Sequence, residues 1–210
     1  MQHVGKLKIK SMDKIREFLN EEHVGRIASI DDKGYPQIIP MNFVYLHDCI
    51  YMHSYHRGEK LENILQCSKV GFEVDRELEF LPSYFKNPHD ASLADTLYIS
   101  VVIKGNGELV ADMKEKTVAL NGLMAKYQPE GRYDLVNSDD KVVDAVAVIK
   151  IIPDIITGKY NIGQNLSQKD RLILAENILE RNSTTAKNTL QIMGFDVVAD
   201  TLKMNNISEW

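Results

Sequence analysis

Apolar and polar residues alternate along much of the first half of the chain, a pattern typical of half-buried β-strands. Longer apolar runs occur further on and predict more central strands, the last of which should end at Pro153. The runs expected to form strands are 25–30, 35–45, 50–54, 70–75, 97–103, 105–110 and 142–152. Most are separated by short turns, so the pattern favours an antiparallel sheet over a parallel one.

Apolar residues at helical spacing predict helices outside this sheet. Three of these helices begin with side chains suited to capping the first turn, namely Ser11, Asp112 and Ser167. The expected helices run from Ser11 to about His23, over 58–67, from Asp112 to about Tyr127, from Ser167 onward, over 184–193 and after Asp196. Residues 77–95 contain two prolines and are expected to form a long loop.

Together these elements predict a mainly β (α+β) fold, an antiparallel β-barrel with peripheral helices and a helical C-terminal tail. The character of the chain changes after residue 157, where strand patterns give way to helical ones. We therefore expect a barrel domain over residues 1–165. A helical extension over residues 166–210 is expected to pack on it.

Composition narrows the functional classes. The 210 residues carry a formal net charge of −5, which argues against a dedicated nucleic-acid binder because such proteins usually present a basic surface. The two cysteines, Cys49 and Cys67, are not arranged as CxxC and are expected to be reduced thiols of a cytoplasmic protein. No signal peptide is predicted, because the first residues, MQHVGKLKIK, contain no apolar core. No membrane span is predicted, because every window of about 20 residues contains charge.

The most informative stretch lies where the strand over 50–54 gives way to the helix over 58–67. Its corner, Ser54 to Lys60, reads SYHRGEK. It combines a hydroxyl, two cations and a glycine with the amides of a helix N-terminus, a combination suited to a phosphate group. The alternative is an ordinary solvated helix start with surface cations.

Several nearby residues have more than one interpretation. Pro40 lies inside a predicted strand, which indicates a sheet edge or a bulge, where a ligand could meet the backbone. His53 should face away from Met52 and Ser54, toward a ligand or into the core. The set His47, Cys49, His53 and His56 lacks the spacing of a closed ligand set, so no metal site is predicted.

The order of these motifs resembles that of a known family. The matching segments are GRIAS, PQIIPMNFVY, IYMHS, YHRGEKLENI, VGFEVD, YISVVIKGNGE and EKTVALNGLMAKY, within about residues 12–165. They resemble the flavin-binding split barrels related to pyridoxamine 5′-phosphate oxidase, and within these most closely the nitroimidazole-resistance (Nim-like) branch. The corner H-S-x-x-x-G-x-K-L is the most specific part of the match.

The resemblance implies a homodimer that binds FMN in clefts between its subunits. The residues that it implies for cofactor binding are Pro40, Met41, Asn42, His53, Ser54, Arg57, Lys60 and Ser100. Within this set, Ser54, Arg57 and Lys60 match the phosphate corner, and His53 matches a position facing the flavin ring. The chain lacks the arginine-rich FMN strand of the vitamin-processing oxidases in this family. It also ends ISEW, where those oxidases have a substrate-binding terminal arginine, so oxidation of pyridoxamine phosphate is not expected.

Three functional hypotheses follow. The first is an FMN-dependent oxidoreductase that reduces small molecules such as nitroaromatics, with His53 as the catalytic side chain near the acceptor. The second is a flavin-binding sensor or regulator without turnover, suggested by the helical tail and by residues 158–165, which resemble a phrase of Pai-type regulators. The third keeps the barrel but replaces flavin by haem, as the histidines would allow.

Overall fold

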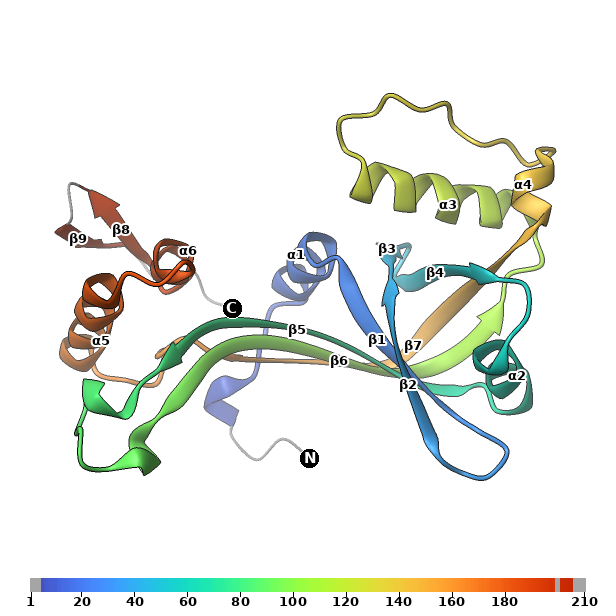
Figure 1. Ribbon diagram of the computed structural model, residues 1–210. Coiled ribbons are helices and arrows are strands. Elements are labelled where there is room, and N and C mark those ends of the chain that lie inside the picture. Colours follow the sequence, from blue (N-terminus) through green and yellow to red (C-terminus); the bar gives the residue numbers. More distant parts are fainter. Residues whose placement is uncertain (1–4, 199–200, 206–210) are drawn as a thin grey trace. The chain divides into compact units, whose positions relative to one another are not determined.

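The structure is a computed structural model that describes residues 5–198 and 201–205 (Figure 1). The chain forms two compact units. The barrel unit comprises Ile15–Val74 and Val101–Thr157. The C-terminal unit comprises Met1–Lys14, Asp75–Ser100 and Gly158–Trp210.

A seven-stranded antiparallel sheet, curled into a split barrel, organises the fold, as predicted. Strands β1 and β2 pair antiparallel, as do β1 and β5, β3 and β4, and β4 and β7. The order across the sheet is β2 (Pro36–Asn42), β1 (Val24–Ile30), β5 (Lys69–Leu81), β6 (Asp95–Leu109), β7 (Val146–Asn161), β4 (Cys49–Tyr55) and β3 (Val44–Leu46). The long strands β5, β6 and β7 contribute residues to both units.

Helices occur in both units, and a hairpin follows the last of them. The helices are α1 (Met12–Glu21), α2 (Glu59–Gln66), α3 (Met113–Tyr127), α4 (Lys141–Asp144), α5 (Gln168–Arg181) and α6 (Ala186–Ile192). Short 3₁₀ turns are η1 (Gly5–Leu7), η2 (Ser83–Phe85) and η3 (Ala91–Leu93), and the hairpin is β8 (Phe195–Val198) with β9 (Thr201–Met204). None of the described helices combines the length and apolarity needed to cross a membrane.

The three predicted helix caps are all present. In each, the side-chain oxygen accepts a hydrogen bond from the amide three residues later, which satisfies one of the unpaired donors of the first turn. The pairs are Ser11 with Lys14 (3.3 Å), Asp112 with Glu115 (2.7 Å) and Ser167 with Asp170 (3.1 Å). Local chemistry therefore sets these helix starts.

The strand predicted over 35–45 is interrupted at Phe43, between β2 and β3. The Phe43 side chain is fully buried and its ring meets that of Phe72 edge-on, with centroids 5.2 Å apart. The Phe43 N–H donates to the Tyr127 hydroxyl of α3 at 2.8 Å. The backbone thus leaves the strand pattern because a side chain from far along the sequence replaces a strand partner.

The predicted loop over 77–95 is partly wrong. Strand β5 continues to Leu81 and β6 begins at Asp95, so the connection is shorter than predicted, and it contains the turns η2 and η3. Leu78, Glu79 and Leu81 are buried. The consecutive burial of Leu78 and Glu79 interrupts the alternation of buried and exposed residues expected of a strand with one face in solvent. The reason lies in packing, since the C-terminal helices cover this end of β5.

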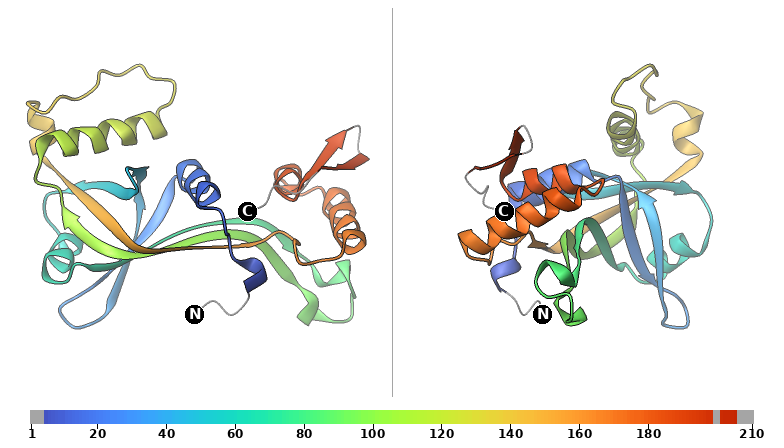
Figure 2. Two further views of the ribbon diagram at one scale, coloured as in Figure 1. Left: turned by 180° about the vertical axis from the view of Figure 1, so that it is seen from behind. Right: turned by 60° about the vertical axis from the view of Figure 1, so that its left-hand side comes forward.

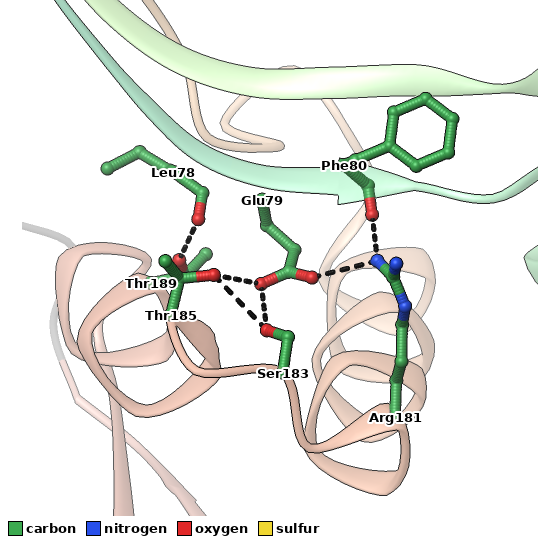
Figure 3. A network of polar contacts seen from close by, with 7 residues as sticks. All are labelled: Leu78, Glu79, Phe80, Arg181, Ser183, Thr185 and Thr189. Carbon is green, nitrogen blue, oxygen red and sulfur yellow. Dashed lines mark hydrogen bonds and ion pairs between the residues drawn. The ribbon is translucent and has the colours of Figure 1, made fainter.

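Figure 3 shows how these helices attach to β5 within the C-terminal unit. The Glu79 carboxylate, whose side chain is 2% exposed, accepts hydrogen bonds from Arg181 (2.9 Å), Ser183 (2.5 Å) and Thr185 (2.7 Å). The Thr189 hydroxyl donates to the Leu78 carbonyl at 2.8 Å. A single buried carboxylate therefore holds the turn between α5 and α6 against the strand.

Two further predictions near the end of the chain are wrong. Residues 142–145, expected to begin a strand, lie largely in α4, and β7 continues through Pro153 to Asn161. Proline's fixed φ suits an extended chain, so Pro153 does not have to end the strand. The helix expected after Asp196 is instead the β8–β9 hairpin, in which Asp196 lies opposite Lys203.

Helix α3 lies over β3 and β4 in the barrel unit (Figures 1 and 2). Tyr51 packs in the apolar cluster beneath it, and its hydroxyl donates to Glu115 at 2.8 Å. Glu115 also pairs with Lys150 of β7 at 2.8 Å. Burial and the hydrogen bond to Glu115 raise the pKa of Tyr51 to about 12. Both faces of β4 are consequently covered in its first half, whereas its last residues are open.

Candidate functional site

The corner between β4 and α2 has the backbone expected of an anion site. Gly58 precedes the helix with φ 134° and ψ 158°, a conformation that residues with a Cβ rarely adopt, and α2 has no side-chain cap. A Cβ at Gly58 would meet nothing within 4 Å, so the approach to the backbone is open. The helix N-terminus therefore presents amides that no capping side chain covers.

The side chains of the first turn do not all favour an anion. Glu59 and Glu62 lie in the first turn of α2, where they already complement the positive end of the helix dipole. The positive charge of the corner must therefore come from Arg57 and Lys60. Arg57 is exposed and forms no ion pair with any residue that the structure describes.

Lys60 links the corner to the edge of the sheet. Its Nζ lies 3.3 Å from the Met41 sulfur of β2, and burial lowers the pKa of this half-buried amine. A thioether is a weak acceptor, so the ammonium keeps donor capacity for a stronger partner. The fold thus brings Met41, predicted from the strand motif, into contact with Lys60, predicted from the corner motif.

Strand β2 forms one edge of the sheet, which confirms the edge position expected for Pro40. Pro40 lies opposite Arg26 of β1, and both Pro40 and Asn42 are exposed. On the neighbouring strand β1, Gly25 lies opposite Met41, and a Cβ at Gly25 would lie only 2.1 Å from the ring of Phe72 on β5. The strand that pairs with this edge is therefore held close to β5 by a glycine–aromatic contact.

His53 and Ser54 lie at the open end of β4. His53 is exposed and pairs with Val148 of β7, whereas Ser54 is half-buried and pairs with Ala147. Met52, on the same strand face as Ser54, is fully buried. The predicted orientation is therefore confirmed: His53 points away from the core, opposite to its two neighbours.

Ser100 is the one predicted site residue that lies outside the barrel unit. It is a half-buried residue of β6 and belongs to the C-terminal unit, whereas the other seven belong to the barrel unit. The structure thus gathers residues of the corner and of β2 through the contact between Lys60 and Met41. A role for Ser100 beside them remains a prediction.

Sequence reasoning missed a buried asparagine that positions the corner. Asn63 of α2 is 3% exposed, and its Nδ2 donates to Ser29 Oγ at 3.3 Å and to Gln37 Oε1 at 3.4 Å. These bonds hold the helix on the β1–β2 hairpin. The signal was available, because Asn63 is a polar residue between Leu61 and Ile64 of the apolar face.

Comparison with known proteins gives a clear family match. A family model described as pyridoxamine 5′-phosphate oxidase matches residues 11–160, which include every residue of the candidate site. A search of curated proteins finds no match.

Solved structures of similar fold include the following three. A candidate 5-nitroimidazole antibiotic resistance protein from Bacteroides thetaiotaomicron is 24% identical, with a TM-score of 0.62 over 73% of this chain and 86% of that chain. The flavocytochrome Anf3 from Azotobacter vinelandii is 17% identical, with a TM-score of 0.66 over 82% and 77%. An FAD and haem binding protein from Mycobacterium smegmatis is 15% identical, with a TM-score of 0.63 over 79% and 78%.

Proposed function

Because this chain belongs to the pyridoxamine 5′-phosphate oxidase family, we propose that it is an FMN-binding flavoprotein that reduces small molecules such as nitroaromatics. The observation that carries the proposal is the corner from Ser54 to Lys60. It combines an uncapped helix N-terminus, an open glycine and two cations without carboxylate partners among the described residues. Solved structures of similar fold include proteins named for FAD binding, which supports a flavin as the ligand.

The residues present fit the anionic end of FMN. The amides of the first turn of α2, the Arg57 guanidinium and the Lys60 ammonium would hold the phosphate, and the Ser54 hydroxyl would add a further donor. Lys60 is well suited to this role because partial burial disfavours its lone charge, and a phosphate would offset that cost. Binding should therefore strengthen as the amine becomes protonated.

The exposed edge of β2 would meet the ring of the cofactor. Pro40, Met41 and Asn42 lie on this edge, and the contact between Met41 and Lys60 joins it to the phosphate corner. When bound, the flavin supplies the electron transfer, while the protein supplies binding and orientation. His53, exposed at the end of β4, would donate a hydrogen bond or a proton to the acceptor, because an imidazole carries an N–H donor.

We further propose a cytoplasmic homodimer with flavin sites between its subunits. The support is the exposure of the site, since His53, Arg57 and the β2 edge leave one side open in a single chain. A partner subunit would exclude water from that side, which strengthens ionic contacts. Light scattering on the flavin-loaded protein measures the assembly, and a monomer that retains full flavin affinity would contradict this arrangement.

The binding test starts from the visible spectrum of the purified protein, in which flavin bands support the proposal and a Soret band would indicate haem instead. Replacing both cations, Arg57→Ala with Lys60→Ala, should then weaken FMN binding by at least about 2 kcal/mol, or roughly thirtyfold, from the loss of two ionic contacts. The matched control, Lys33→Ala with Lys104→Ala, removes two exposed cations elsewhere and should leave the affinity unchanged. Equal affinities in the two double variants would remove the phosphate assignment.

Turnover is tested separately from binding. The photoreduced protein is mixed with a nitroimidazole, and reoxidation of the flavin is followed by absorbance. We expect the protein-bound flavin to be reoxidised faster than free FMN, and we expect this acceleration to be smaller in the His53→Ala variant. A rate equal to that of free FMN would reject the reductase and leave a flavin-binding sensor as the function.

A further inference from the structure

The C-terminal unit contains a cleft of its own. Its volume is about 680 Å³, within the range typical of small-molecule sites. Its walls come from the end of β5 with η2, from β6, from the end of β7 with the following loop, and from α5. Apolar side chains form much of this lining, among them Leu81, Phe85, Leu97 and Leu174. None of the corner residues Ser54 to Lys60 takes part.

Two lysines line the cleft without a carboxylate partner. Neither Lys86 nor Lys159 forms an ion pair with any residue in the described part of the chain. The Lys159 ammonium lies 5.4 Å from the centre of the Tyr98 ring, which also lines the cleft. This cation is therefore held beside an aromatic surface, where the flat body of a ligand could lie.

The two carboxylates of the lining are already engaged by their own neighbours. Asp95 accepts a hydrogen bond from the Thr96 amide at 2.7 Å and another from the Asn161 side chain at 3.4 Å. Asp170 accepts from the Ser167 hydroxyl at 2.7 Å, within the N-terminal cap of α5. These two carboxylates therefore form hydrogen bonds within the walls of the cleft and are not paired with Lys86 or Lys159.

The side chain of a third cationic residue packs behind the lining at Gly163. Arg171 is 3% exposed, and its guanidinium donates to the Met193 carbonyl and lies 5.6 Å from the Phe195 ring. Its Nε has no hydrogen-bond partner, and no described carboxylate pairs with it. Its Cγ lies 3.8 Å from where a Cβ on the cleft residue Gly163 would stand. A buried charge without a counter-ion is costly, so a nearby anion would lower that cost.

From these contacts we propose that the cleft binds a small organic anion with an aromatic body, such as an aromatic carboxylate. The apolar walls would take the ring, and Lys86 and Lys159 would pair with the anionic group, with Arg171 adding to the positive potential. The site is independent of the proposed flavin site, because the two share no residue.

The probe is anilinonaphthalenesulfonate, an aromatic anion whose fluorescence rises when its rings leave water. The full-length, flavin-loaded protein should bind one dye per chain. Lys86→Gln combined with Lys159→Gln should weaken this binding about tenfold, the effect of losing a charge-assisted contact. N-Phenylnaphthylamine, which has the same rings without the sulfonate, should bind the variant and the parent protein equally.

A second pair of variants tests the location. Ile173 and Leu172 are neighbouring residues of α5, 43% and 36% exposed, and only Ile173 lines the cleft. Ile173→Glu should weaken binding of the sulfonate dye, whereas Leu172→Glu should leave it unchanged. The Arg57→Ala, Lys60→Ala protein should also bind the dye normally, so that loss of flavin binding is distinguished from loss of this site.

Several results would overturn the proposal. They are absence of saturable dye binding, equal affinities in the lysine double variant and the parent, or equal losses for the charged and neutral dyes. Dye binding that falls as protein concentration rises would assign the cleft to a contact between copies of the chain, and would overturn it as well.

Discussion

Removing the Glu79 carboxylate should loosen the C-terminal helices from β5. Its side chain is 2% exposed and accepts hydrogen bonds from Arg181, Ser183 and Thr185 at 2.5–2.9 Å. Each bond to a charged group contributes about 1.5–3 kcal/mol, but Arg181 is one-third exposed and can regain water. Allowing for that, Glu79→Ala should lower the free energy of unfolding by about 3–5 kcal/mol, as when one partner of a buried pair is removed.

Urea unfolding followed by circular dichroism measures this loss, and hydrogen exchange locates it. Faster exchange should be confined to α5, α6 and the end of β5, because the network joins only these elements. Glu77→Ala is the matched control, since Glu77 lies two residues earlier on the same strand and is exposed, and it should change stability by no more than about 0.5 kcal/mol. A loss below about 1 kcal/mol for Glu79→Ala, or exchange that rises evenly over the chain, would refute the reasoning.

Two further predictions concern the barrel unit. Gly25→Ala should cost about 1–3 kcal/mol in thermal or urea unfolding, because its Cβ would lie 2.1 Å from the buried Phe72 ring, whereas Gly5→Ala meets open space and should cost little. Burial lowers the pKa of Lys126 to about 8, so the unfolded chain binds more protons between pH 8 and the ordinary lysine value of 10.5. Stability should therefore rise by about 1–2 kcal/mol across that window after allowance for solvent screening, and unfolding measured at several pH values should show no such rise in Lys126→Met.

The parts of the fold that sequence reasoning predicted correctly depend on neighbours along the chain. The caps at Ser11, Asp112 and Ser167 each use an amide three residues away, so the local pattern suffices. The edge position of Pro40 follows from its missing N–H, and the outward direction of His53 from the two-residue period of a strand.

The errors arose where distant segments meet. Residues 77–81 are predicted to belong to a loop because the segment to residue 95 is irregular and contains two prolines. They form a strand, and Arg181, Ser183 and Thr185 surround the buried Glu79 carboxylate. The predicted strand is interrupted at Phe43 because the hydroxyl of Tyr127, 84 residues later, accepts a hydrogen bond from the Phe43 amide. No pattern within a short window contains such information.

Local patterns were enough to predict the antiparallel class, the helix starts and a strand-to-helix corner over Ser54 to Lys60, because capping, strand alternation and turn chemistry act over a few residues. The contact of Lys60 with Met41, the anchoring of α2 by Asn63 and the cleft near the buried Arg171 became visible only in the folded chain. These depend on the burial of side chains from separate segments, where desolvation and long-range hydrogen bonds, rather than local propensity, set the free energy.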